Sequence, residues 1–381
     1  MERIIPWTPE HKMFRESIKK FVEKEMVPYY QQWEDDGIVS REVYKKLGAI
    51  GGLCPWAEEK YGGAAGDFLY SVIVAEEIAN HGCKSMEAWL HNDLVGPYIK
   101  NFATEEQKER WLPGCVTGDI ILAVAMTEPD SGSDLASMRT RAVKDGDDYI
   151  INGSKTFISN GILGDLIVVA TKTDPDKGAR GITLFGVERG TPGFERGRNI
   201  DKVGMHAQDT AELFFEDCRV PAKNIIGGLN EGWSCLMSGL QQERLLVSII
   251  ALGCTERAME LTLDYVKERK QFKKPIGSFQ NTQFTLAECA AEIAVARGYI
   301  DTLILAHAKG EKILDEISMA KFWVCEMENR VISKCLQFFG GYGYCKEYEI
   351  SRLWADARIE TIYAGTSEIM KLIIARGLGL A

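Results

Sequence analysis

The sequence predicts an α+β protein in three parts: an N-terminal α-helical domain over residues 1–120, a middle antiparallel β-barrel or sandwich over 121–228, and a C-terminal four-helix bundle over 229–381. Three observations predict this fold class. Apolar residues recur at helical spacing in the first part, short apolar runs between turn residues fill the second, and long helical patterns return in the third. A length of 381 residues is typical of two or three domains.

Helix-start signals recur in the N-terminal part. Thr8 precedes a proline, the pattern of a capping residue followed by proline at the first helical position. Ser40 can cap a second helix, and Thr104 and Gln107 have the spacing of a capping box. These signals, each followed by apolar residues at helical spacing, predict a helical N-terminal domain.

The middle part contains short strand-like runs at 120–124, 149–151, 166–170, 182–185 and 213–215. Clusters of glycine, aspartate and asparagine separate these runs, and no long helical pattern lies between them. A parallel, doubly wound sheet needs helices between its strands, so this pattern favours an antiparallel barrel or sandwich. In the third part, segments 231–268, 281–310 and 314–339 are each long enough for a bundle helix.

Composition excludes several classes of protein. The net charge of −10 argues against non-specific binding to nucleic acid or to an anionic membrane. No apolar run approaches the ~20 residues of a membrane-spanning helix, and no secretory signal pattern begins the sequence. We therefore expect no integral membrane segment and a cytoplasmic location, or the mitochondrial matrix if a transit peptide has been removed.

Cysteine and histidine spacing predicts neither disulfides nor a metal site. The ten cysteines are scattered, several of them within apolar helical stretches, which is typical of buried free thiols in a reducing compartment. Five histidines make no metal-ligand pattern. The two common phosphate-binding loops are also missing, because 340–343 follows a helix and lacks the third glycine of a dinucleotide fingerprint. A cofactor would have to be held by the β part and the bundle.

Five stretches combine polar, aromatic and glycine residues in a way that suits ligand binding: 126–134, 155–161, 269–272 with Gln280, 337–343 and 362–369. Each alone has an ordinary interpretation as a turn, a strand or a helix end. The last one places Thr366 or Ser367 at the start of a final helix, and a helix N-terminus suits a pyrophosphate.

In this order and spacing, the five stretches resemble the acyl-CoA dehydrogenases over essentially the whole chain, with the long-chain acyl-CoA and isovaleryl-CoA dehydrogenase branches closest. Further matches are 202–205, 212–217 and 242–245. The resemblance implies the fold of that family, bound FAD, an acyl-CoA substrate, a homotetramer, and re-oxidation by electron-transferring flavoprotein.

The resemblance also implies roles for individual residues. The implied flavin-ring contacts are Val124, Met126, Thr127, Phe157, Ile158 and Ser159, and Ser133 would touch both FAD and CoA. The implied contacts across a subunit interface are Arg269, Gln271, Phe279 and Gln280. The remaining implied FAD contacts are Gln337, Gly340, Gly341, Thr366 and Glu368. The implied substrate contacts are Ser133, Gln241, Arg244, Ala364 and Gly365.

The position of the catalytic base departs from the commonest pattern of the family. Most members carry a glutamate directly before Gly-Thr-Ser, where this chain has Ala364, which cannot accept a proton. In the two branches named above the base lies on a bundle helix, and Glu243 matches that position. The sequence supports Glu243 independently, because it interrupts an apolar stripe formed by Leu236, Leu240, Val247 and Ile250. A carboxylate there is costly unless it is paired or functional.

Asp93 is an alternative base. As a loop aspartate it can be a helix cap or a turn residue, but some family members that act on alicyclic acyl-CoA esters use an aspartate in this region. Three hypotheses follow: ordinary α,β-dehydrogenation with Glu243, an alicyclic acyl-CoA dehydrogenase with Asp93, and a catalytically silent flavoprotein of the same fold. The acyl chain length is not readable from the sequence.

Overall fold

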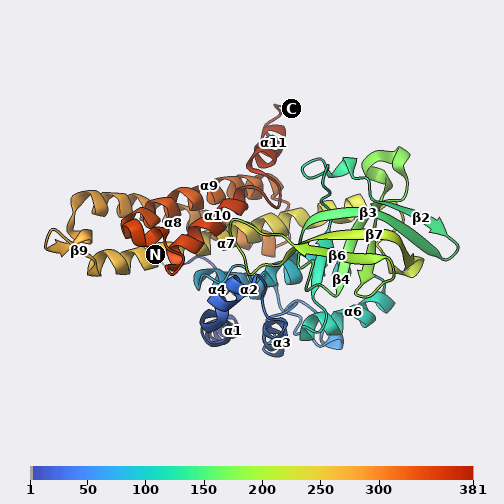
Figure 1. Ribbon diagram of the computed structural model, residues 1–381, viewed down its shortest axis with the longest axis horizontal. Coiled ribbons are helices and arrows are strands. Elements are labelled where there is room, and N and C mark those ends of the chain that lie inside the picture. Colours follow the sequence, from blue (N-terminus) through green and yellow to red (C-terminus); the bar gives the residue numbers. More distant parts are fainter. Residues whose placement is uncertain (1–2, 381) are drawn as a thin grey trace.

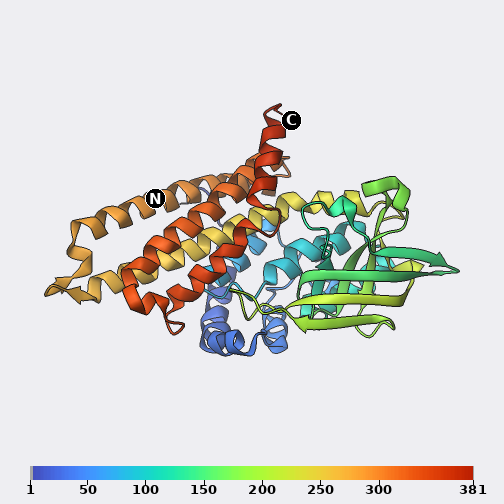
Figure 2. The same ribbon diagram turned by 45° about the horizontal axis from the view of Figure 1, so that its top comes forward.

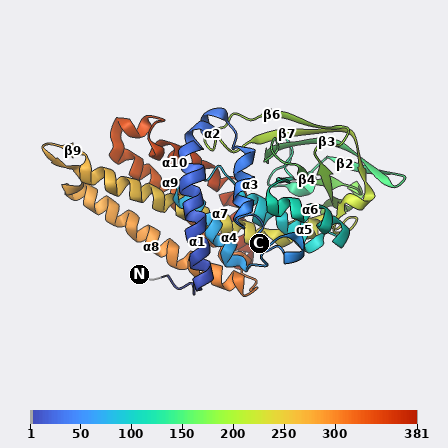
Figure 3. The ribbon, with the colours of Figure 1, turned by 90° about the horizontal axis from the view of Figure 1, so that it is seen from below.

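The N-terminal helices lie across the middle of the molecule, between a β domain at one end and long helices that extend to the other (Figure 1). The computed structural model describes residues 3–380. The same three-part arrangement, with a helical, a sheet and a second helical region, is predicted from the sequence, and it is confirmed. The view from below shows α1, α2 and α3 lying across the junction of the other two parts (Figure 3).

The N-terminal helices are α1 Pro9–Phe21, α2 Tyr30–Asp36, α3 Arg41–Ala49, α4 Phe68–Asn80, α5 Gly96–Phe102 and α6 Glu105–Thr117, with π-helical turns η1 Val22–Met26 and η4 Leu90–Val95. Two predicted caps are confirmed. The Thr8 hydroxyl accepts a hydrogen bond from the backbone N–H of His11, and the Thr104 hydroxyl accepts one from that of Gln107. Ser40 precedes α3 but makes no side-chain cap bond.

The strands are β1 Leu122–Ala125, β2 Arg141–Asp145, β3 Asp148–Ser159, β4 Leu166–Lys172, β5 Ile182–Glu188, β6 Phe194–Asn199, β7 Thr210–Pro221 and β8 Ile225–Ile226. They form one sheet in the order β6-β7-β3-β2-β4-β5-β8, with β1 paired to β4. Most pairs are antiparallel, as predicted, but β2 meets β4 in parallel at Arg141 and Lys172, and β1 runs parallel to β4 and places Leu122 opposite Leu166. The chain forms the β2–β3 hairpin between these two strands, which gives it the length that a parallel connection needs.

Sequence patterns do not reveal β2 and β6. Their sequences, RAVKD and FERGRN, carry charged side chains at several positions, and each strand has only one buried residue. β6 is an edge strand paired only with β7, and β2 lies between β3 and β4 but pairs with β4 only at Arg141, so neither strand needs much apolar sequence of its own.

The C-terminal helices are α7 Gly232–Glu268, α8 Gln280–Ala308, α9 Leu314–Phe339, α10 Glu349–Ala357 and α11 Ser367–Gly377, and the three longest match the predicted segments. A short hairpin, β9 Lys270–Gln271 and β10 Lys274–Pro275, joins α7 to α8. Short 3-10 helices are η2 Val27–Tyr29, η3 Glu59–Tyr61, η5 Leu135–Ser137, η6 Pro175–Gly181, η7 Ala222–Asn224, η8 Ile276–Ser278, η9 Gly340–Tyr344 and η10 Arg358–Thr361. The last helix, α11, stands out from the body with the C-terminus at its tip (Figure 2).

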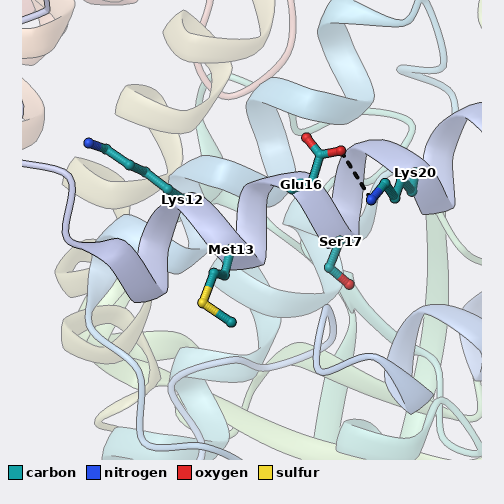
Figure 4. Close-up of a pocket in the computed structure, with 5 residues that line it drawn as sticks. All are labelled: Lys12, Met13, Glu16, Ser17 and Lys20. Carbon is teal, nitrogen blue, oxygen red and sulfur yellow. Dashed lines mark ion pairs between the residues drawn. The ribbon is translucent and has the colours of Figure 1, made fainter.

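All ten cysteines are free thiols; nine are buried and Cys345 is exposed. Among residues 3–380, no helix is both long enough and apolar enough to cross a bilayer. The outer face of α1 carries an open surface hollow lined by Lys12, Met13, Glu16, Ser17 and Lys20 (Figure 4). These side chains come from one helix face, and Glu16 pairs with Lys20 at 3.3 Å in solvent. The hollow lies away from the residues discussed below.

Glu76 of α4 connects the N-terminal part to the bundle. Its carboxylate accepts hydrogen bonds from Arg3 at 2.9 Å, from Arg15 of α1 at 2.7 Å and from Arg297 of α8 at 2.8 Å. Burial opposes ionisation of Glu76, but the charges of Arg297, Arg3 and Arg15 outweigh it and lower the pKa to about 2. Removing the partner of a buried charge destabilises the fold strongly, because the remaining charge is left buried and unpaired.

We predict that Glu76→Gln lowers the free energy of unfolding near neutral pH by about 3 kcal/mol, because three arginines lose their shared anion. The ionised group contributes stability above its ordinary pKa of 4.5, and that contribution disappears as the pH falls toward 2. Urea titrations at pH 7 and at pH 3 should therefore show a smaller difference from wild type at pH 3. Glu16→Gln, at the exposed pair, is the matched control and should change little. An equal effect of the two substitutions would contradict this role.

Candidate active site

Glu243 lies in the N-terminal third of α7, and only 5% of its surface is exposed. Its Oε2 atom has no hydrogen-bond partner among the described residues. Burial raises the pKa of Glu243 to about 7, although the charges of Arg244 and Lys321 oppose that shift. A buried carboxyl group with a free oxygen and a pKa near neutral is suited to accept a proton.

The loop 363–365 lies next to Arg244 and Lys321, the two cations whose charges act on Glu243, and it has an unusual backbone. Ala364 has a φ of +53° and Gly365 a φ of +94°. Lys321 of α9 donates hydrogen bonds to the carbonyl oxygens of Tyr363 at 2.9 Å and Gly365 at 2.7 Å. Arg244 of α7 donates to the carbonyl oxygen of Ala364 at 3.4 Å. Two cations from different helices thus fix this loop.

Buried polar atoms around this loop lack partners. Besides Glu243 Oε2, the Nη1 atom of Arg244 and the hydroxyl of Tyr363 make no hydrogen bond among the described residues. Buried polar groups in native proteins are normally paired, so a group of free ones indicates space for a polar ligand or for water. The arrangement offers one acceptor and two donors to such a ligand.

Asp93 is buried in η4 rather than at a loop or helix cap. Gln242 donates to its Oδ1 atom at 3.2 Å and to its backbone oxygen at 3.1 Å, while Oδ2 has no partner. Burial raises the pKa of Asp93 to about 7, with Ser71 and Lys100 opposing the shift. The cap interpretation is wrong because Asp93 lies within the π-helical turn η4, where its side chain contacts Gln242, the residue before Glu243 on α7.

A buried ion pair shapes the loop 126–134. Lys155 of β3 donates to Glu128 at 2.8 Å and to the backbone oxygen of Met126 at 3.0 Å. Glu128 also accepts from the backbone N–H groups of Arg139 at 2.6 Å and Thr140 at 2.9 Å. Glu128 and Lys155 are buried, so this pair holds the loop against the sheet, whereas Asp130, Gly132 and Ser133 of the loop are exposed.

Phe157 lies next to this loop in a β-bulge. The pairing of β3 with β7 shifts between Lys155 and Ile158, and Phe157 has a φ of +58°. A bulky residue with positive φ is rare and strained. The bulge turns the ring outward, where 66% of it is exposed, whereas Ile158 packs into the core of the sheet. An outward aromatic ring at this place suits a planar ligand.

The remaining predicted cofactor residues gather at the hairpin end of the bundle. The guanidinium of Arg269 lies 5.5 Å from the ring centre of Tyr342, and Tyr265 stacks on Phe339 at 4.2 Å. These two contacts place the residues around the hairpin β9–β10 next to η9, the 3-10 helix that follows α9. Gln271, Gln280, Gln337, Gly340 and Gly341 are exposed there, and Phe279 is partly exposed. A Cβ atom added to Gly340 or Gly341 would meet nothing within 4 Å, which leaves room for a ligand.

The predicted cofactor residues therefore form two separate groups. The hairpin lies at the end of the molecule farthest from the sheet (Figure 1). Along α7, Glu243 and Arg269 are separated by roughly 39 Å at 1.5 Å per residue. One bound dinucleotide cannot reach both ends of the same chain.

The other predicted residues are placed as follows. Val124, Met126, Thr127 and Ser159 are partly exposed around the loop, and Ser133 is fully exposed on it. The Thr366 hydroxyl accepts from the N–H of Ile369 at the start of α11, and Glu368 is exposed on its first turn. Gln241 faces the bundle instead, where its side chain accepts from Ile313 N–H at 2.9 Å and contacts His307 at 3.0 Å.

Sequence reasoning did not identify Lys321 or Tyr98 as site residues. Lys321 interrupts the buried stripe of Ile317 and Val324 on α9, which is the same signal that singles out Glu243. Tyr98 of α5 has a buried hydroxyl without a partner close to Gly239 and the charge of Glu243. A lone tyrosine in a helix carries no such signal.

Comparison with protein families matches the whole length of the chain. Residues 8–119, 123–218 and 230–379 match the N-terminal, middle and C-terminal domains of the acyl-CoA dehydrogenases. The curated relatives include the mouse mitochondrial long-chain specific acyl-CoA dehydrogenase, 45% identical over 97% of this chain and 86% of the relative. Isovaleryl-CoA dehydrogenase of Pongo abelii is 36% identical over 96% of this chain and 88% of the relative.

Solved structures give the same result. An acyl-CoA dehydrogenase from Geobacillus kaustophilus is 54% identical, with a TM-score of 0.97 over 99% of this chain and 100% of the other. A glutaryl-CoA dehydrogenase from Mycobacterium smegmatis, solved in complex with FADH2, is 29% identical, with a TM-score of 0.91 over 98% of this chain and 95% of the other.

Gly365→Ala is predicted to distort the loop 363–365. The new Cβ atom would lie 2.7 Å from Met370 Cε, and the residue would also have to keep a φ of +94°. We expect a loss of about 1–3 kcal/mol in the free energy of unfolding, measured by denaturant titration. Gly190→Ala is the matched control, because Gly190 has a φ of +84° with no atom within 4 Å of an added Cβ. If both substitutions cost the same, contact with Met370 plays no part.

Proposed function

This chain belongs to the acyl-CoA dehydrogenase family of FAD-dependent oxidoreductases, and we propose that it converts an acyl-CoA thioester to the 2-enoyl-CoA with Glu243 as the base. The observation that carries the proposal is the buried, unpartnered oxygen of Glu243, whose neighbour in the chain, Arg244, binds the loop 363–365. Ala364 offers no carboxyl group of its own, so the proton acceptor has to come from elsewhere in the chain, and we place it at Glu243 of α7.

The chemistry explains why the carboxyl group is buried. The α-hydrogen of a thioester is a weak acid, and a base works best when its pKa lies near the working pH. Burial raises the pKa of Glu243 to about 7, so above that pH the group is ionised and ready to take the proton. The free N–H of Arg244 and the fixed loop at Ala364 support binding of the thioester end of the substrate.

The residues around the β-bulge fit a flavin ring. Phe157 presents an exposed aromatic ring, and Glu128 and Lys155 fix the neighbouring loop 126–134 to the sheet. We propose that Val124, Met126, Thr127, Phe157 and Ser159 line the ring and that Ser133 reaches toward both FAD and CoA. When bound, FAD supplies the acceptor of the β-hydride, at N5 of the flavin.

We propose a homotetramer in which the hairpin end of one subunit completes the FAD site of another. The support is the separation of the two groups of cofactor residues along α7. The hairpin also carries Phe272, which is 88% exposed, and exposed apolar residues of this kind are typical of interfaces. In this arrangement, Arg269, Gln271, Gln280, Gln337 and Gly341 would bind the half of FAD that lies away from the flavin ring.

The proposed electron acceptor is electron-transferring flavoprotein, in keeping with the family. The proposed location is the cytoplasm, or the mitochondrial matrix if a transit peptide is removed, since the name of the mouse relative includes that organelle.

A second candidate uses Asp93 as the base for an alicyclic acyl group. Its support is that Asp93 also has a buried, unpartnered oxygen and a pKa of about 7. However, Gln242 already donates to the other oxygen of Asp93, and the two cations that bind the loop 363–365 act on Glu243. We therefore place Glu243 first.

Glu243→Gln is predicted to reduce turnover by about 10²–10⁴-fold, because the amide cannot take the proton. Flavin content and melting temperature should be retained. In the wild-type enzyme, kcat/KM should fall as the pH drops below about 7, where Glu243 becomes protonated. Anaerobic flavin bleaching by straight, branched and cyclic acyl-CoAs measures the loss of activity in Glu243→Gln and the pH dependence of the wild-type enzyme.

Asp93→Asn is the comparison variant for that experiment. Loss of activity in Asp93→Asn with full activity in Glu243→Gln would favour the alicyclic enzyme. Bound FAD that no acyl-CoA bleaches, even in the wild-type protein, would favour a catalytically silent flavoprotein.

Arg269→Glu is predicted to release FAD and to weaken assembly together, because it reverses a charge at the proposed subunit contact. Light scattering and flavin absorbance after gel filtration measure the two quantities. Arg198→Glu, an exposed arginine on β6, is the control. If the wild-type protein is itself a monomer and Arg269→Glu still loses FAD, the FAD site is not shared between subunits.

A further inference from the structure

Glu87 is a buried carboxyl group that the proposed reaction does not use. It lies in the turn 81–87 between α4 and η4, and only 1% of its surface is exposed. Its Oε2 atom has no hydrogen-bond partner among residues 3–380. Burial raises the pKa of Glu87 to about 8, and a hydrogen bond from Ser159 opposes that shift. A buried carboxyl group that keeps its proton near neutral pH can both donate and accept a hydrogen bond.

Two polar residues anchor the turn that carries Glu87. Lys84 donates to Glu360 of η10 at 2.6 Å, and the hydroxyl of Ser85 donates to Glu34 of α2 at 2.8 Å. All four of these side chains are buried. Because the backbone of the turn is fixed by partners from two other elements, the carboxyl group of Glu87 is held in place.

Ser159 is held equally firmly on the other side of this contact. It ends β3, and the next residue, Asn160, has a φ of +57°. The side chain of Asn160 donates to the backbone oxygen of Leu122 at 3.0 Å and accepts from the hydroxyl of Tyr44 at 3.2 Å. Ser159 itself is partly exposed. Its hydroxyl therefore has a buried neighbour, Glu87, and a partly open side.

The charged and titratable groups that face Glu87 come from several elements. They are Lys84, Lys202, Glu360, Tyr44 and Tyr363. Lys84 is bound to Glu360, and the ammonium group of Lys202 donates to a backbone oxygen at 2.7 Å. Since both cations have other acceptors, Ser159 is the side chain that hydrogen-bonds to Glu87.

We propose that Glu87 is a positioning residue for the flavin, and that its proton sets the direction of the Ser159 hydroxyl. The inference rests on the proposed function, in which Ser159 lines the flavin ring. When Glu87 is protonated, its O–H donates to Ser159 Oγ, and the hydrogen of the serine hydroxyl is free to point at the ring. When Glu87 is ionised, its carboxylate accepts that hydrogen, and the ring loses the donor.

The direction of this hydroxyl should change how easily bound FAD is reduced. Reduction adds electrons to the ring, and a donor aimed at the ring stabilises the added charge. Loss of one such hydrogen bond should make reduction about tenfold less favourable, which is about 30 mV for a two-electron couple. Because the pKa of Glu87 is about 8, the loss should occur as the pH rises through that value.

The test is the midpoint potential of the FAD-loaded enzyme, measured by spectroelectrochemistry from about pH 6 to about pH 10. The wild-type enzyme should show a downward step of about 30 mV near pH 8, beyond the smooth pH slope common to all variants. Glu87→Gln carries an amide that donates to Ser159 at every pH, so it should keep the higher potential and lose the step. Glu328→Gln changes another buried carboxyl group, 3.8 Å from Lys84, and should keep the step.

Ser159→Ala separates positioning from a direct effect of charge. If Glu87 acts through the hydroxyl, Ser159→Ala should lower the potential and abolish the step, and adding Glu87→Gln should change nothing further. A step that survives in Ser159→Ala, or one that Glu328→Gln also removes, would overturn the inference, because charge in the buried cluster would then explain it.

The wild-type titration needs no substitution, so the test does not depend on a variant that folds. A flavin that an acyl-CoA reduces, but whose potential shows no step near pH 8, would overturn the inference and leave the proposed function intact. If the flavin takes electrons from the electrode but from no acyl-CoA, the proposed function fails, while the step still decides the role of Glu87.

Discussion

The site depends on keeping one carboxyl group buried with one oxygen free. Burying an unpaired charge in an apolar interior costs free energy, and this cost raises the pKa of Glu243 to about 7. The two nearest cations do not pair with it directly. Lys321 and Arg244 are bound instead to the backbone oxygens of the loop 363–365, and they act on Glu243 only through their charge. Because the two cations bind the loop, the carboxyl group of Glu243 stays free to accept a proton, and the loop 363–365 is held in place.

The long helix α7 sets the second constraint. One helix carries the proposed base in its N-terminal third and leads, at its C-terminal end, into Arg269 and the hairpin β9–β10. A rigid helix of 37 residues cannot bring its two ends to one ligand. A site that uses residues from both ends therefore requires a second copy of the chain. In this account, cofactor binding and assembly are two consequences of the same helix length.

Much of this architecture is predictable from the sequence, for local reasons. The caps at Thr8 and Thr104 and the three long bundle helices follow from spacing alone. Glu243 stands out because it breaks an apolar stripe, and Lys321 carries the same signal. What escapes prediction depends on contacts that are distant in sequence. Three features have no local signature in the sequence: the parallel pairing of β1 with β4, the bulge at Phe157, and the π-helical turn that brings Asp93 into contact with Gln242 of α7. The inward turn of Gln241 toward His307 is another example, because the bundle loop that binds it lies about seventy residues away.

The most direct measurement of the central claim separates proton removal from oxidation. A thioester analogue that cannot give up its β-hydride, but whose α-hydrogens remain exchangeable, reports the base alone when the FAD-loaded enzyme is placed in deuterated water. Mass spectrometry or NMR then follows deuterium at the α-carbon. The account predicts rapid exchange with wild-type enzyme and with Asp93→Asn, and almost none with Glu243→Gln. Exchange at the wild-type rate in Glu243→Gln would show that another group removes the proton.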